Sequence, residues 1–475
     1  MTSRLVLHRG AYYDSVALML ASRDAEAIEG VELVAAVAGT PVNITLLHDQ
    51  GFEPPDDVGP NDMVVAIRAA DDDAATAAER AVDRRLSERA EPSGAAVFAP
   101  RSIRSAVRAN PDLKVAFVSV PGRYAAYEVA EAIEAGLHVF CFSDGMSLDD
   151  EAELKRRALD RGLLFLGADC GTAIVDGVGF GFANVVERGP VGIIGASGTG
   201  IQQVTCLLDA AGIGISQALG VGGRDLSTEV GGIMSDRCLQ VLADDASTEI
   251  IVLVSKPPGG AVAEKIVAAA ARTGKPAVVG LLAGAGDSEL PAAPEGVTVV
   301  GSLEDAAAAA ADLAGGRVET HDIEPPPRST PGGLRGLFCG GSLCFEAHAA
   351  TGGGDFIDFG ADEYTTGRAH PMIDPTLRND HFEKTSVDMG VGAIVLDVVL
   401  GAGAHPDPAG ELAPSIEAVL ERRRDLTIIV AVCGTGRDPQ ELGRQVKQLT
   451  AAGALVTRNA AHAGRLARGA VGTSL

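Results

Sequence analysis

Short apolar runs alternate with alanine-rich amphipathic stretches along most of the chain. The runs at 115–120, 139–142 and 163–166 are rich in Val, Leu and Phe and have the length of buried strands. The stretches between them, at 125–135 and 151–161, have the periodicity of amphipathic helices. This alternation predicts an α/β fold with parallel sheets covered by helices.

The N-terminal 90 residues have a different pattern. Strand-like and helix-like segments follow one another in an order that favours a small α+β domain of the ferredoxin type. The expected elements are a strand at 4–8, a helix at 14–21, strands at 31–37 and 63–67, and a helix at 74–86. The segment Gly39-Thr-Pro-Val-Asn43 could present two small polar side chains to a neighbouring site, but its composition favours a turn.

Composition shifts divide the chain further, and a proline-rich stretch at 323–331 is the clearest linker. Strand-and-turn patterns before this linker recur after it at nearly constant spacing, which indicates a tandem duplication of an α/β domain. The expected domains are a small α+β domain at 1–90, a Rossmann-like domain at 91–188, a flavodoxin-like domain at 189–322 and its copy at 332–475.

The net charge of -25 disfavours nucleic acid and anionic membranes as partners. No apolar run has the roughly 20 residues of a membrane-spanning helix, and the first twelve residues lack the layout of a secretory signal, so we expect a cytoplasmic protein. Seven dispersed cysteines without a second pair at zinc spacing predict reduced thiols and no metal site.

The strongest chemical signal is Gly192-Ile-Ile-Gly-Ala-Ser-Gly-Thr-Gly200, an apolar strand that passes through glycines directly into a helix. The N-terminus of a helix presents free N–H donors and a partial positive charge, so a phosphate is the expected ligand. Close packing of the glycines, with the hydroxyls serving only as helix caps, is the alternative. The predicted phosphate-binding residues are Gly195, Ser197, Gly198, Thr199 and Gly200.

Two further segments carry candidate residues. In Gly401-Ala-Gly-Ala-His405, a glycine-rich turn follows a strand of the second copy, so Gly401, Gly403 and Ala404 are expected to bind the same phosphate. His405 would act as a hydrogen-bond donor or acid, although a lone histidine is more often structural. A polar loop contains Arg368, His370 and Arg378, which could bind a carboxylate and donate a proton, or could form an ordinary surface loop.

The motifs Gly167-Ala-Asp-Cys-Gly171 and Gly220-Val-Gly-Gly-Arg-Asp225, together with the glycine-rich strand-to-helix turn, resemble the α subunit of succinyl-CoA synthetase over residues 115–284. Residues 332–472 resemble the C-terminal part of the β subunit. Over nearly its whole length the chain is similar to the FdrA family. The resemblance implies succinyl-CoA synthetase-like Rossmann and flavodoxin-like domains.

Departures from the synthetase pattern shape the functional expectation. The family's phosphorylated histidine is absent from Leu282-Ala-Gly-Ala-Gly-Asp-Ser288, and Lys256 occupies the position of a glutamate that would contact it. The glycine-rich CoA-binding turn and the ATP-grasp segment have no counterpart. FdrA proteins are also similar to a subunit of oxamate carbamoyltransferase, an enzyme of allantoin breakdown.

The resemblance therefore implies a carbamoyltransferase subunit that transfers carbamoyl between phosphate and a small amide. Lys256, His370 and His405 would be catalytic, and Arg368 and Arg378 would bind the carboxylate of the acceptor. The implied partners are carbamoyl phosphate or another acyl phosphate and companion subunits or further copies, with no cofactor. The alternatives are an acyl-CoA synthetase that needs partner subunits and a phosphate-binding sensor or scaffold.

Overall fold

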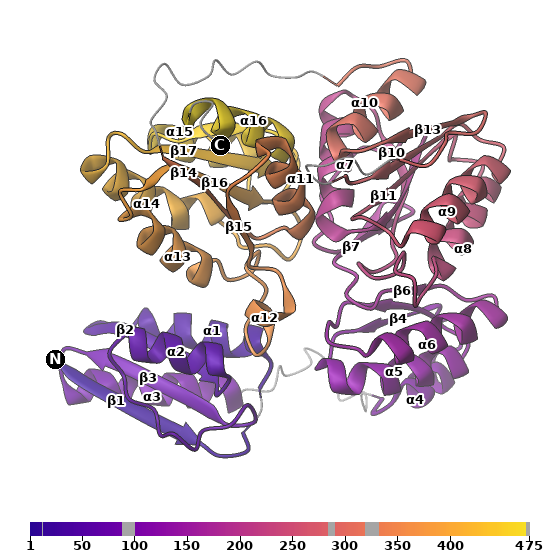
Figure 1. The fold of residues 1–475 in the computed structure, drawn as a ribbon. Helices are drawn as coiled ribbons and strands as arrows, with labels where there is room; N and C mark the ends of the chain where they lie inside the picture. Colours follow the sequence, from indigo (N-terminus) through magenta and orange to yellow (C-terminus); the bar gives the residue numbers. More distant parts are fainter. Residues whose placement is uncertain (12, 88–99, 284–289, 319–331, 472–475) are drawn as a thin grey trace. The chain divides into compact units, whose positions relative to one another are not determined.

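The computed structural model describes residues 1–475 except 12, 88–99, 284–289, 319–331 and 472–475. Contacts divide the chain into two units, of which the first combines 1–99 with 360–374 and the second combines 100–359 with 375–475 (Figure 1). The linker predicted at 323–331 lies outside the described residues. No described helix is long and apolar enough to span a membrane.

The first unit is a small α+β fold with a three-stranded antiparallel sheet in the order β1-β3-β2. Its central strand alternates, so that Val65 and Ile67 join a core with α1 and α3, whereas Val64 and Ala66 join a second core with Leu47 of α2. Both faces of the sheet are therefore covered. The elements are β1 (Thr2–His8), α1 (Ser15–Glu26), β2 (Val31–Ala38), α2 (Pro41–Asp49), β3 (Met63–Ala69) and α3 (Asp72–Ser87).

The second unit begins with a small parallel sheet in the order β4-β5-β6. Alanine and valine residues on α5, among them Ala125, Val129 and Ala132, are fully buried in a core that also contains Phe140. The elements are α4 (Ile103–Ala109), β4 (Val115–Val118), α5 (Gly122–Glu134), β5 (His138–Cys141), α6 (Leu148–Asp160) and β6 (Phe165–Leu166).

Two larger parallel modules follow, and their strands have the same order. The first is arranged β13-β12-β11-β9-β10 and continues into the antiparallel hairpin β7–β8, and the second is arranged β15-β14-β16-β17-β18. Both therefore follow one topology, as expected for a duplicated domain. The strands of the first module are β7 (Thr172–Val175), β8 (Val178–Gly181), β9 (Val191–Ala196), β10 (Ile215–Gly220), β11 (Ile250–Ser255), β12 (Ala277–Leu281) and β13 (Val297–Val300). Those of the second are β14 (Gly333–Phe338), β15 (Asp355–Asp358), β16 (Val391–Val399), β17 (Thr427–Cys433) and β18 (Leu455–Thr457).

Helices cover both faces of each module (Figure 1). In the first module α7 and α10 pack together on one face and α8 and α9 on the other. In the second, α11 and α16 correspond to α7 and α10. The helices are α7 (Gly198–Ala210), α8 (Ile233–Asp244), α9 (Gly260–Arg272), α10 (Leu303–Leu313), α11 (Gly341–Thr351), α12 (Asp362–Thr365), α13 (Thr376–Ser386), α14 (Pro408–Arg422), α15 (Leu442–Ala451) and α16 (Ala460–Val471).

The predicted α/β fold with parallel sheets and a small N-terminal α+β domain is confirmed. Two local features differ from the sequence expectation. The segment expected to form a turn at Gly39–Asn43 leads into α2, because Thr40 caps the helix and Pro41 is at its first position. Residues 360–374, expected within the domain at 332–475, belong by their contacts to the N-terminal unit.

A buried charge cluster joins the small parallel sheet to the first large module. Lys155 of α6 is fully buried and donates to Glu151 and Asp225 at 2.8 Å each and to the carbonyl of Val221 at 2.9 Å. Arg224 lies 2.8 Å from the second oxygen of Glu151. Two cations and two carboxylates thus balance one another, and three of the four side chains are fully buried, where an unpaired charge is costly.

We predict that Lys155→Met destabilises the protein by about 3 to 5 kcal/mol, because it leaves Glu151 and Asp225 buried without their shared cation. Urea unfolding followed by circular dichroism measures the change. Lys447→Met, at an exposed position of α15, is the control and should shift the transition little. Equal midpoints for the two variants would contradict this account.

Candidate functional site at the facing helix N-termini

The glycine-rich turn after β9 leads into α7 as predicted, and close packing requires glycine at Gly195 and Gly200. A side chain at Gly195 would place its Cβ 2.4 Å from Ile201 Cγ1, and one at Gly200 would lie 2.5 Å from Ser197 Oγ. Ser197 caps α7 by accepting a hydrogen bond from the Gly200 amide at 2.8 Å. The cap and packing roles that were the alternative to phosphate binding are thus both present.

The second module contains an equivalent turn after β14, where Asp397 of the neighbouring strand β16 holds the backbone. Its carboxylate accepts hydrogen bonds from the amides of Cys339 at 2.7 Å and Gly340 at 2.8 Å. Burial raises the pKa of Asp397 to about 6. A Cβ at Gly340 would lie 2.8 Å from Thr199 Cγ2 of the first module, so only glycine permits this approach.

The N-termini of α7 and α11 meet at this point. Ser197 Oγ and Ser342 Oγ are 2.5 Å apart, although 145 residues separate them in sequence. Among the described residues, no acceptor is found for the amides of Gly198, Thr199 and Gly341, which lie in the half-buried first turns. Two helix N-termini with unsatisfied donors form a favourable environment for an anion.

A charged pair from the two modules flanks the same place. Lys256, directly after β11, has its Nζ 3.9 Å from Asp358 Oδ2 at the end of β15, and its side chain is 45% exposed. A Cβ built at Gly341 would lie 2.6 Å from Lys256 Nζ and 2.3 Å from the Asp358 carboxylate. The cation therefore lies beside the first turn of α11, where it can add to the positive potential of both helices.

Sequence reasoning missed Glu346, which lies one helical turn after Ser342. It is buried in α11, and its Oε1 accepts from the amides of Leu303 at 2.7 Å and Glu304 at 3.1 Å at the start of α10. Burial raises its pKa to about 7. A glutamate that caps a helix of the other module gives no local sequence signal, because its partners are about 40 residues away in the chain.

Further hydrogen bonds fix one module against the other. Asn184 donates to the Leu400 carbonyl at 2.9 Å and to Asp438 at 2.7 Å, and Gln202 of α7 donates to the same carbonyl at 3.0 Å. Arg465 of α16 pairs with Glu304 at 2.7 Å. The orientation of α7 relative to the second module is therefore set by buried polar contacts over a wide area.

The loop at Gly401–Ala404 makes different contacts from those expected. The Gly401 amide donates to Gln440 Oε1 at 3.2 Å, and a Cβ at Gly401 would lie 2.4 Å from the Phe182 carbonyl. The amide of Ala404 donates to the Gly401 carbonyl, so two of the predicted phosphate donors already have acceptors, whereas Gly403 is exposed. His405 Nδ1 accepts from the Asp407 amide at 3.1 Å, a local turn contact.

Arg368 and His370 belong to the N-terminal unit. Arg368 donates to Asn43 Oδ1 at 3.3 Å and lies 3.8 Å from Asp374. His370 is half-buried, and desolvation of its ring lowers its pKa to about 4, while its Nδ1 accepts from the Met372 amide at 3.2 Å. A neutral histidine of this kind is a poor proton donor near neutral pH.

Arg378 lies in the other unit and is 1% exposed. Its guanidinium donates to the Asp397 carbonyl at 2.8 Å and lies 3.6 Å from the Asp397 carboxylate. It thereby supports the residue that holds the turn before α11. The role predicted for Arg378, binding an acceptor carboxylate, was part of the carbamoyl-transfer interpretation. In the structure its guanidinium instead contacts Asp397.

Comparison with known proteins identifies the modules. A family model described as an AllF heavy metal-associated domain matches residues 1–99, a CoA-binding domain matches 186–280 and a CoA-ligase domain matches 337–470. The matched N-terminal region contains no cysteine. Within the described ranges, no group of three or more His, Cys, Asp or Glu side chains is placed to hold a metal ion.

The relatives cover different parts of the chain. The uncharacterised protein YahF of Escherichia coli is 35% identical over 98% of both chains. A succinate–CoA ligase α subunit of Archaeoglobus fulgidus is 31% identical over 38% of this chain, and a sulfoacetate–CoA ligase subunit of Bilophila wadsworthia is 27% identical over 35%. The matches span 63% and 58% of those ligase subunits.

Solved structures with similar folds include an acetyl-CoA synthetase of Candidatus Korarchaeum cryptofilum, at 18% identity and a TM-score of 0.33. That comparison covers 75% of this chain and 82% of the other. An ATP citrate lyase of Methanothrix soehngenii has 18% identity and a TM-score of 0.37, covering 48% of this chain and 43% of the other.

The carbamoyltransferase interpretation, and with it the assignment as a transferase, is wrong. Both helix N-termini of the site lie in regions matched by CoA-binding and CoA-ligase models, and the curated relatives of the first region are ligase subunits. Carbamoyl phosphate and an amide acceptor have no support among these relatives. The alternative of an acyl-CoA synthetase-like protein fits the findings better.

The raised pKa of Glu346 predicts a pH-dependent stability. The folded protein keeps this proton up to about pH 7, whereas a glutamate ordinarily titrates near 4.5. The contribution of Glu346 is therefore full below about pH 4.5 and is lost as the pH rises through 7. Relative to Glu346→Gln, the wild type should lose up to about 3 kcal/mol of stability across this interval.

Urea unfolding of both proteins at several pH values between 4.5 and 8 tests this. Glu264→Gln, an exposed glutamate of α9, is the control and should follow the wild type throughout. If the stability difference between wild type and Glu346→Gln is independent of pH, Glu346 does not titrate as described.

Proposed function

The chain belongs to the FdrA-like family of Escherichia coli YahF. From its CoA-binding and CoA-ligase regions and their ligase relatives, we propose that it acts as an acyl-CoA synthetase-like protein. The phosphoryl group of an acyl phosphate would bind between the N-termini of α7 and α11. The observation that carries the proposal is the contact of Ser197 with Ser342, which brings together two helix N-termini with unsatisfied amides.

The geometry suits a reaction in which phosphate leaves an acyl group. In such a step the thiol of CoA gives its proton to solvent and its sulfur attacks the acyl carbon, so that a C–S bond forms as the C–O bond to phosphate breaks. Negative charge develops on the departing phosphate. Amides of Gly198, Thr199 and Gly341 and the ammonium of Lys256 would stabilise that charge without reorganisation.

Lys256 would serve this chemistry better than the glutamate that the synthetase pattern has at its position. A carboxylate beside a phosphate dianion is repulsive, whereas an ammonium attracts it. Asp358 now neutralises Lys256 across 3.9 Å, and an incoming phosphate would compete with this carboxylate for the cation. The proposal needs no phosphohistidine, because the acyl phosphate is itself the phosphorylated species.

Companion chains are part of the proposal. The curated relatives of the CoA-binding region are named as ligase subunits, so this chain would work with partner subunits. Such partners would supply the nucleotide that forms the acyl phosphate and a binding site for CoA, since the family's glycine-rich CoA-binding turn and ATP-grasp segment have no counterpart here. The soluble, cytoplasmic location expected from the sequence stays a prediction.

We predict opposite effects for the two residues of the flanking pair. Lys256→Met should weaken binding of acetyl phosphate and inorganic phosphate about tenfold, because it removes a cation from the anion site. Asp358→Asn should strengthen binding, because the neutral amide no longer competes for Lys256. Isothermal titration calorimetry measures the affinities of both variants. Lys265→Met is the control, because the Nζ of Lys265 donates to the Gly231 carbonyl instead.

Turnover is measured as phosphate release from acetyl phosphate, with and without CoA, for the full chain alone and with companion subunits. CoA-dependent release that Lys256→Met abolishes supports the proposal. Phosphate binding without CoA-dependent release in any mixture would favour the sensor or scaffold. Unchanged phosphate affinity in both variants would place the anion site elsewhere.

A further inference from the structure

The outer edge of β4 has unpaired backbone groups. Among the described residues, β4 pairs with β5 alone. The carbonyls of Lys114 and Val118 accept from His138 and Phe142, so these even-numbered residues direct their backbone groups toward the rest of the sheet. The backbone groups of Val115 and Phe117 therefore point to the outer edge, where another strand can pair with them.

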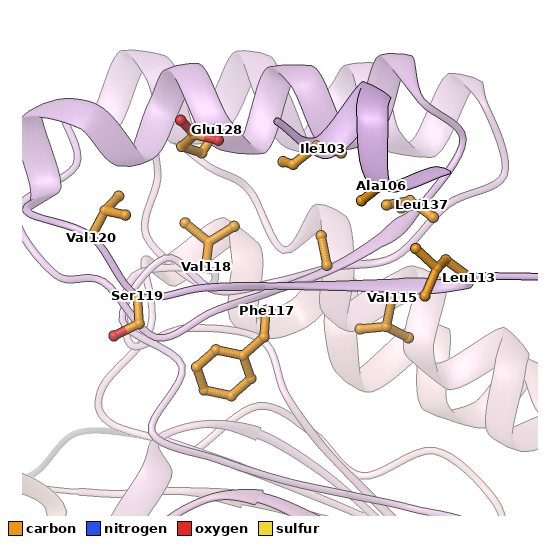
Figure 2. Close-up of a pocket in the computed structure, with 11 residues that line it drawn as sticks. Ile103, Ala106, Leu113, Val115, Phe117, Val118, Ser119, Val120, Glu128 and Leu137 are labelled. Carbon is orange, nitrogen blue, oxygen red and sulfur yellow. The ribbon is translucent and has the colours of Figure 1, made fainter. Parts of the chain in front are cut away.

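An apolar pocket lies directly beside this edge, between β4 and the helices that cover it (Figure 2). Its accessible volume is about 340 Å³. Figure 2 shows Ile103 of α4 and Val118 of β4 facing one another across it, with Phe117 on the opposite face of the strand. A pocket of this kind, formed by a helix and the edge strand of a sheet, can accept every second side chain of an added strand.

The exposed surface next to the pocket is also apolar. Val115 is 44% exposed and Phe117 is 51% exposed, and the two lie two positions apart in β4. Contiguous exposed apolar surface of this kind marks interaction sites. The Phe117 ring stacks on Phe140 with 4.8 Å between centroids, which fixes it in place. The edge strand thus offers contacts on both faces of an added strand.

Glu128 gives the surface its charge preference. It is the charged residue among those that line the pocket, it is half-buried, and no ion-pair partner is found for it among the described residues. A carboxylate beside apolar side chains favours a cationic group on whatever occupies the pocket. The net charge of -25 on the whole chain strengthens this preference.

We propose that the β4 edge binds an extended segment of a partner polypeptide, which adds as a strand beside β4. Its side chains alternate, so that apolar residues enter the pocket between α4 and β4, and a lysine, arginine or free N-terminus pairs with Glu128. The proposal is independent of the anion site, because none of the residues at α7 or α11 takes part in it.

A display library of random eight-residue peptides, selected against the full-length protein, tests the surface. We expect enrichment of sequences with alternating apolar residues and at least one basic residue. A synthetic peptide of the enriched sequence then serves as the probe in fluorescence polarisation. It should slow hydrogen exchange at the amides of Val115 and Phe117.

Val115→Pro separates pairing at the outer edge from folding. Its missing N–H faces outward, so the β4–β5 ladder is preserved while one hydrogen bond to the peptide is lost and the strand approach is blocked. We expect binding to weaken at least about tenfold for Val115→Pro, and about tenfold for Glu128→Gln through loss of the charge contact. Tyr127→Ala, exposed on α5 and outside the pocket lining, is the matched control and should bind normally.

Three outcomes overturn the proposal. These are no enrichment, enriched peptides that bind Val115→Pro as tightly as the wild type, and self-association of the wild type that Val115→Pro abolishes. The last result would assign the edge to a second copy of this chain. Retained acetyl phosphate binding in Val115→Pro shows that the variant is folded. It also shows that loss of peptide binding at the β4 edge leaves the anion site at α7 and α11 intact.

Discussion

The contact between the N-termini of α7 and α11 depends on how the two parallel modules are held together. Asn184 and Gln202 of the first module donate to the Leu400 carbonyl of the second. In the other direction, Glu346 of the second module caps the first turn of α10 in the first module. These bonds are buried, so breaking any of them leaves a polar group without a partner, at a cost of about 1 to 3 kcal/mol. These bonds consequently hold α7 and α11 rigidly in place. The amides in the first turns of the two helices stay unsatisfied, whereas in a loosely packed interface they would pair with nearby carbonyls.

Much of this arrangement was predictable from local patterns. The strand and glycine turn at Val191–Ala196 identified α7 and its cap Ser197, because a buried strand that enters a helix through glycine has few other readings. Ser342 was not among the predicted phosphate-binding residues, although Gly340 and Gly341 directly precede it, because the phosphate turn of the second copy was expected at Gly401–Ala404. Its position follows only from the packing of two modules across 145 residues of sequence.

The functional error had a different origin. The carbamoyl-transfer interpretation rested on synthetase motifs missing from this chain and on the similarity of FdrA proteins to a carbamoyltransferase subunit. A missing motif excludes one mechanism but does not identify the reaction that replaces it. Gly401 looked like a phosphate turn because it follows a strand, yet its amide is bound to Gln440 and its Cα lies against the Phe182 carbonyl. The sequence does not reveal which acceptors, such as Gln440, already bind the amides of a glycine-rich turn. They decide whether such a turn can still bind an anion.

The segment at 360–374 has a consequence for synthesis of the chain. Its Gly367 carbonyl accepts from Asn43, and its Arg368 contacts the same side chain, so the N-terminal unit contains residues that are translated after most of the ligase-like part. At ribosomal rates of roughly 5 to 20 residues per second, residues 360–374 are synthesised some tens of seconds after residues 1–99. During that interval Thr40 and Asn43 lack their contacts with Gly367 and Arg368. The N-terminal unit therefore reaches its final structure only after residue 374 has emerged from the ribosome.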